Sequence, residues 1–140
     1  MTATGGEIST DAGKVAVGVC SSGCGAGNDT NRAMNSSESL GFRLTDPGKT
    51  AQCLALGLMG TTAANTTVAV SITFKRNGVT VDSLITSALV NSTMPTSPQL
   101  ANLAPAPAGT LFDEVVVQPV GSSLFYAARL HFSTAGACAP

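Results

Sequence analysis

Four cysteines are the residues of this sequence whose chemistry is easiest to interpret. Cys20 and Cys24 are separated by Ser-Ser-Gly in a glycine-rich stretch, whereas Cys53 and Cys138 have no close cysteine neighbour. An even number of cysteines in a chain rich in Ser and Thr favours disulfides formed in an oxidising compartment, and four cysteines allow three pairings. We expect Cys20 to pair with Cys24, and Cys53 with Cys138. Free thiols and a zinc site are the alternatives, although zinc prefers several closely spaced ligands and only one short-spaced pair is present.

Oxygen ligands suited to a hard cation are concentrated in one segment. Asn28, Asp29, Asn31 and Glu38 precede a predicted strand, and calcium binds carboxylate, amide and backbone oxygens. The same residue types also form ordinary turns. A structural calcium is therefore the one cofactor that the sequence indicates, with a plain turn as the alternative interpretation.

Residues for acid–base or nucleophilic catalysis are sparse. His131 is the single histidine, and the Gly-x-Ser-x-Gly pattern of a nucleophile elbow does not occur in the sequence. Asp113 and Glu114 are adjacent, so on a strand their side chains point to opposite faces and cannot act on the same bond. We predict no catalytic residues and a protein that is not an enzyme.

Composition excludes several classes of partner. The 140 residues include 7 basic and 8 acidic ones, for a net charge of −1, and nucleic-acid binding requires a basic surface that such a chain lacks. No apolar run reaches the length of about 18 residues that spans a membrane. Trp is absent and aromatic residues make up 4% of the chain. A polysaccharide would therefore have to bind through hydrogen bonds rather than through stacked rings.

Alternating apolar and polar residues predict strands along most of the chain. Val68, Val70, Ile72 and Phe74 share one face of a strand, and the following Asn77-Gly78 is the preferred pair for a two-residue type I′ hairpin turn. The other expected strands cover 14–19, 39–44, 51–59, 79–81, 111–117 and 123–133.

Two further segments carry specific expectations. The proline-rich segment 91–110 is expected to be a surface loop with a single helical turn at 100–104. In the last strand, the larger residues are expected to face the core, namely Leu124, Tyr126, Leu130 and Phe132.

These elements predict an all-β protein, an antiparallel β-sandwich of the jelly-roll type with seven to nine strands. The sandwich is expected to cover 14–135. Residues 1–13 would form a flexible N-terminal arm, and 136–140 a C-terminal tail tied by Cys138. No apolar signal-peptide core follows Met1, so the sequence is either that of a cytoplasmic protein or a mature region with an added Met. The cysteine pattern and the composition favour the second.

Two groups of motifs resemble a known family. Gly18-Val19-Cys20 and Glu38-Ser39-Leu40-Gly41-Phe42 form the first group, and the segments 111–117 and 125–132 form the second. The sequence resembles the secreted jelly-roll β-sandwich domains of exosortase-sorted (PEP-CTERM type) bacterial surface and matrix proteins. The resemblance implies an extracellular or cell-surface location and a structural calcium. The chain departs from the family in lacking a sorting tail and in carrying Ala127 and Ala128 where relatives often have acidic residues.

Scarce Lys and Glu residues suggest how such a sandwich would be used, because long charged side chains normally keep sheet edges from pairing with other molecules. We predict a non-catalytic extracellular structural protein that forms a homo-oligomer, filament, matrix or surface layer. It would associate through strand edges or its N-terminal arm, with Val15, Val17 and Val19 as the expected assembly segment. The alternative is a calcium-assisted glycan-binding or cell-surface adhesion module.

Overall fold

The structure, a computed structural model, describes residues 2–4, 7–10, 17–20, 33–46, 48–93 and 98–133. These residues form ten strands and no helix. The strands are β1 (Thr2–Thr4), β2 (Glu7–Thr10), β3 (Val17–Cys20), β4 (Ser39–Arg43), β5 (Cys53–Met59), β6 (Thr66–Arg76), β7 (Val79–Val90), β8 (Leu100–Leu103), β9 (Glu114–Pro119) and β10 (Tyr126–Ser133).

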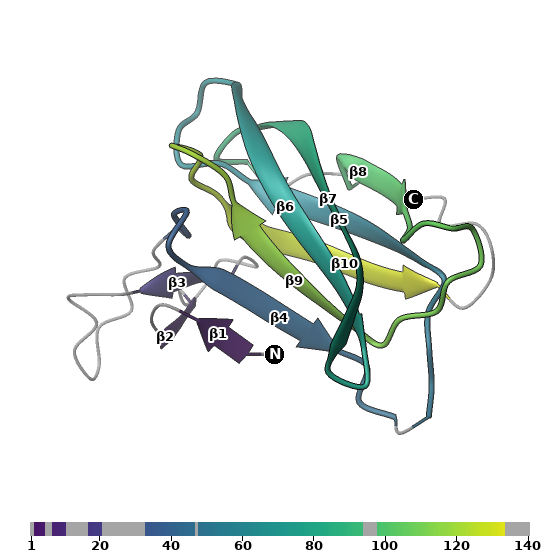
Figure 1. Cartoon of the computed structure of the whole chain (residues 1–140). Coiled ribbons are helices and arrows are strands. Elements are labelled where there is room, and N and C mark those ends of the chain that lie inside the picture. Colours follow the sequence, from purple (N-terminus) through teal and green to yellow (C-terminus); the bar gives the residue numbers. More distant parts are fainter. Residues whose placement is uncertain are drawn as a thin grey trace.

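Two five-stranded sheets face each other (Figure 1). The first has the order β1-β4-β9-β6-β7 and the second the order β2-β3-β10-β5-β8. Every pair of neighbouring strands is antiparallel. The prediction of an all-β, antiparallel β-sandwich is therefore confirmed.

Strands β3 to β10 pair in a nested order. The pairs are β3 with β10, β4 with β9, β5 with β8 and β6 with β7. This is the pairing of one long hairpin rolled into two sheets, and it is the order that a jelly roll would have. Residues 1–13, expected to be a flexible arm, contribute β1 and β2 to one edge of each sheet.

The core lies between the sheets and follows the period of two expected from the sequence. Val68, Val70, Ile72 and Phe74 of β6 are all buried, as are the core residues of β5, Leu54, Leu56 and Leu58. The Asn77-Gly78 turn has positive φ at both residues, 51° and 79°, as a type I′ turn requires. Both predictions for this hairpin are confirmed.

Two local predictions are wrong. Residues 100–103 form β8 and not a helical turn, because Leu54 and Leu56 of β5 pair with Leu103 and Leu100. In β10, a bulge between Ala127 and Arg129 reverses which residues face the core.

The consequence of this bulge is seen on both sides of it. Before the bulge, Phe125 and Ala127 belong to the core, whereas Tyr126 packs with Met59 in a separate cluster. After the bulge, Leu130 and Phe132 pack against the core as expected. Leu124, which was expected inside, is exposed.

Candidate functional sites

The disulfide prediction falls mostly on residues outside the described part of the chain. Cys53 is disulfide-bonded and buried. Cys24 and Cys138 lie outside the described residues, and the side chain of Cys20 is not described. Neither expected pairing is therefore tested.

The expected calcium ligands divide in the same way. Asn28, Asp29 and Asn31 lie outside the described residues. Glu38 is 2% exposed, and its Oε1 accepts the Asn35 N–H at 2.8 Å while the Glu38 N–H donates to the Asn35 carbonyl at 3.0 Å. This carboxylate therefore closes the turn that precedes β4. Within the described ranges, no group of three or more His, Cys, Asp or Glu side chains is placed to hold a metal ion.

The described part of the expected assembly segment, β3, has a strand on either side of it. Val15 lies outside the described residues, whereas β3, which includes Val17 and Val19, is paired with β2 on one side and β10 on the other. Val19 is 1% exposed and belongs to the core. A role of Val15, Val17 and Val19 in assembly stays a prediction, and the described part of the segment has a paired backbone and a buried Val19 side chain.

Charged side chains gather at one end of the sandwich, where β4 ends, β6 turns into β7 and β9 begins. This charged end comprises Arg43, Asp46, Lys49, Lys75, Arg76, Asp113 and Glu114. Asp113 holds it together, because its N–H donates to the Lys75 carbonyl, its C=O accepts the Leu44 N–H, and its Oδ2 accepts the Asn77 N–H.

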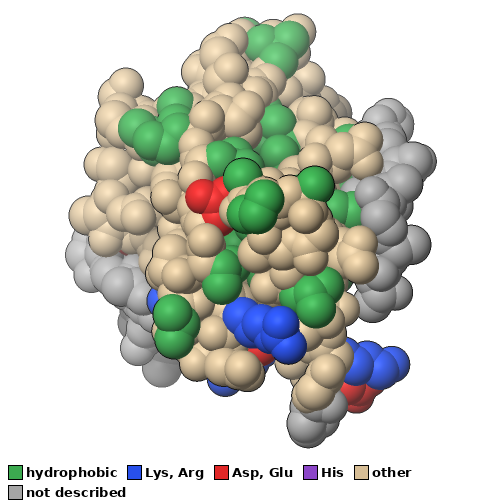
Figure 2. Space-filling model, turned by 45° about the vertical axis from the view of Figure 1, so that its right-hand side comes forward, with side chains coloured by type: hydrophobic (Ala, Val, Ile, Leu, Met, Phe, Trp, Pro, Cys, Tyr) green, Lys and Arg blue, Asp and Glu red, His purple; other side chains and the backbone are tan. Residues whose placement is uncertain are grey.

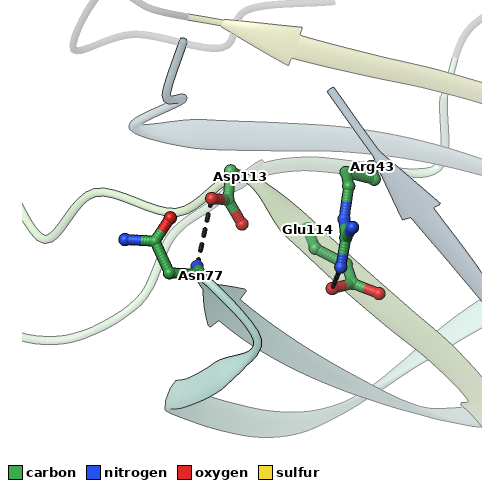
Figure 3. Close-up of polar contacts among 4 residues, drawn as sticks. All are labelled: Arg43, Asn77, Asp113 and Glu114. Atoms are coloured by element: carbon green, nitrogen blue, oxygen red, sulfur yellow. Dashed lines mark hydrogen bonds and ion pairs between the residues drawn. The ribbon is translucent and has the colours of Figure 1, made fainter. Parts of the chain in front are cut away.

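Next to this junction, Arg43 and Glu114 form a cross-strand ion pair at 3.0 Å (Figure 3). Asp113 and Glu114 thus act on different partners, as expected for adjacent residues of an extended segment. His131 is exposed on β10, away from both carboxylates in the strand order, because β10 belongs to the second sheet and β9 to the first.

A polar cleft of about 430 Å³ opens at the charged end. It is lined by Arg43, Leu44, Asp46, Gly48, Lys49, Asn77, Gly78 and Asp113. Two positive and two negative side chains are among the lining residues, and Lys49 Nζ lies 3.5 Å from Asp46 Oδ2. Such a lining offers both donors and acceptors to a neutral, hydroxyl-rich ligand, but only one apolar side chain for it to pack against.

The opposite end of the sandwich has almost no charge. A groove of about 240 Å³ there is lined by Gly60, Thr61, Thr62, Thr66, Thr67, Val68, Val90, Ser122, Ser123 and Leu124. The loops around it are tied by a hydrogen bond from Asn91 Nδ2 to Asn65 Oδ1 at 3.0 Å and by backbone bonds that join Gly60 to Asn91 and Thr62 to Ser92.

The feature that sequence reasoning missed is the edge formed by β7. Three of the four sheet edges are short, since β1 has 3 residues and β2 and β8 have 4 each, whereas β7 has 12. Among the residues that the structure describes, no strand pairs with the outer edge of β7. Short edge strands discourage pairing with another molecule, and β7 lacks that protection.

The side chains of β7 also suit it to pairing with another molecule, because two long apolar ones are exposed and few are charged. Ile85 is 69% exposed and Leu89 is 55% exposed, and Asp82 is the only charged residue of the strand. Figure 2 shows hydrophobic groups spread over a largely uncharged surface, with charged groups gathered mostly toward its lower end. The sequence signal was available in Val79–Val90, a long β-branched segment without Lys or Pro.

Comparisons with known proteins give this chain no relative. No family model, no curated protein and no solved structure matches it. The described residues also contain no helix long and apolar enough to cross a membrane.

Proposed function

We propose that this protein is a non-catalytic extracellular structural protein that self-associates through the edge of β7. The observation that carries the proposal is the 12-residue edge strand with Ile85 and Leu89 exposed. An open edge presents a row of backbone N–H and C=O groups that a strand from another molecule can pair with.

Among the described residues, the hydrogen bonds around β7 that involve loops lie toward its two ends. Near the hairpin, the Ala106 N–H donates to Asp82 Oδ2 at 2.7 Å, so the loop before β9 is fastened to the start of the strand. At the other end, the backbone bonds of Asn91 and Ser92 hold the following loop against the loop after β5. The edge between these two fastenings is the segment 83–90, which contains no charged residue.

The proposed extracellular location is supported by the oxidation state of a cysteine. Cys53 is disulfide-bonded, and disulfides persist mainly in oxidising compartments. The assembled form would be a filament, matrix or surface layer. Its cohesion would come from backbone hydrogen bonds and from apolar side chains on the same face of neighbouring strands.

The experiment is to measure mass by light scattering over a range of concentrations, with negative-stain microscopy of the same samples. We expect the wild type to associate and the Ile85→Lys/Leu89→Lys variant to associate at least tenfold more weakly, because like charges would meet across the contact. Leu124→Lys is the matched control, since Leu124 is also an exposed apolar residue but lies outside β7. A wild type that stays monomeric at the highest concentration would refute the proposal.

A second candidate function is binding of a neutral polysaccharide in the polar cleft, favoured by the donors and acceptors that line it. Retention on a polysaccharide array that is lost in Lys49→Gln would support it. Lys49 is well exposed, so this change should leave the fold intact. Equal retention of the Lys49→Gln variant would exclude the cleft as the binding site.

A further inference from the structure

The edge of β7 restricts how a second strand can pair with it. In an antiparallel ladder, two facing residues form either a hydrogen-bonded pair, in which each bonds to the other, or a non-hydrogen-bonded pair, in which the N–H and C=O groups of both point away from the partner strand. For two copies of one strand, facing residue numbers must therefore add up to a constant even number. The twofold axis then passes beside the residue whose number is half of that sum. Facing residues are both even or both odd, so their side chains lie on the same face of the sheet.

A bulge and a charged residue near the start of β7 make some registers less favourable than others. Phe74 pairs with Asp82 and Lys75 with Thr80, so Val81 is an extra, bulged residue. An axis at Ile85 would align the segment 80–90 with itself and include this bulge. An axis at Thr86 would align 82–90 and place Asp82 opposite Val90, which is buried.

An axis at Ser87 avoids both difficulties. It aligns the segment 84–90 with itself, since each facing pair adds up to 174, and this segment has neither charge nor bulge. Ile85 then faces the partner's Leu89 on the outer side of the sheet, and this contact occurs twice. Two of the three exposed apolar side chains of β7, Ile85 and Leu89, are thus covered, whereas Val79 at the hairpin end is not.

Charge placement favours the same register. Asp82 lies five residues from Ser87, so the two Asp82 side chains would be ten residues apart along the strand direction, about 34 Å at roughly 3.4 Å per residue. Their repulsion is weak at that distance, because it exceeds the Debye length at physiological salt several-fold.

We propose that the partner of β7 is a second copy of this chain, paired antiparallel about a twofold axis at Ser87. This inference rests on the proposed self-association and specifies its geometry. A twofold contact of this kind closes into a dimer. Growth into a filament would require a second contact, and the opposite edge of the same sheet is β1.

Cysteine cross-linking tests the register. Facing residues of an antiparallel pair have Cα atoms about 4.5 or 5.5 Å apart, and both separations suit a disulfide. Ser87→Cys should therefore form a covalent dimer under mild oxidation at least tenfold faster than Ser83→Cys or Ile85→Cys. All three positions are exposed on β7, and wild type treated identically controls for the native cysteines.

The outcomes are distinguishable. Fastest cross-linking by Ile85→Cys would overturn the register while leaving self-association through β7 intact. Association of the wild type without cross-linking of any variant would overturn pairing through β7. A monomeric wild type would refute the proposed function, and the inference with it.

Discussion

The Asn77 backbone N–H donates to Asp113 Oδ2 at 3.1 Å and fastens the tip of the β6–β7 hairpin to the residue that precedes β9. Asp113 is itself held by backbone bonds to Lys75 and Leu44. One residue thus joins three strands of the first sheet at the charged end. The hairpin that carries the open edge of β7 is positioned by this junction.

Removing the Asp113 side chain should loosen the junction. Asp113→Ala is expected to lower the free energy of unfolding by about 1 kcal/mol, because a typical hydrogen bond contributes about that amount. Urea denaturation without a reductant measures the change. Asp46→Ala is the control and should cost under about 0.5 kcal/mol, since the Asp46 side chain forms an exposed ion pair with Lys49. Equal losses for the two variants would contradict this role for Asp113.

Gly78 should resist substitution because of its backbone conformation. Its φ is 79°, and no atom lies near the position of an added Cβ. Gly78→Ala is therefore expected to cost about 1–2 kcal/mol through backbone strain alone. Asn77→Gly, with φ of 51° at the same turn, should change stability much less, and thermal unfolding of both variants decides. A neutral Gly78→Ala would argue against the type I′ turn.

Gly41 leaves room for the Thr2 side chain where β1 pairs with β4. A Cβ at Gly41 would lie 2.6 Å from Thr2 Oγ1, closer than packed atoms tolerate. Gly41→Ala should raise amide hydrogen exchange in β1 while leaving exchange in β6 and β9 unchanged. Adding Thr2→Ala removes the clashing oxygen and should restore protection. Failure of the double variant to recover would show that this contact is not the cause.

Phe112 should be among the most costly core residues to truncate. It is fully buried, and its ring centroid lies 4.9 Å from that of Phe74 and 6.0 Å from that of Phe132. Phe112→Ala is expected to destabilise the protein by about 3–5 kcal/mol through lost burial and a cavity. Phe112→Leu, which retains most of the apolar contact, should cost clearly less in the same denaturation experiment. Similar losses for both would indicate that ring packing contributes most of the effect.

Sequence periodicity was sufficient to predict the fold class and several elements. Val68, Val70, Ile72 and Phe74 repeat with a period of two over a long segment, and Asn77-Gly78 needs only local backbone sterics to form its turn. These patterns involve residues that are close in the sequence, so they can be recognised without the tertiary structure. They predicted neither the bulge beside Ala127 nor β8, because a single inserted residue and a short strand leave no periodic trace.

The candidate assembly site could be predicted from the sequence only in part. A low content of charged residues predicted association through strand edges or the N-terminal arm, and Val15, Val17 and Val19 were the expected segment because they lie near the N-terminus. Which strand ends a sheet depends on the order in which distant segments pair, and β3 acquires partners from both β2 and β10. In the part of the chain that the structure describes, the tertiary structure decided that β7 is the long edge strand and that charged side chains gather around Asp113. Both features depend on contacts between residues that are far apart in the sequence. Local sequence patterns do not predict which distant segments come into contact.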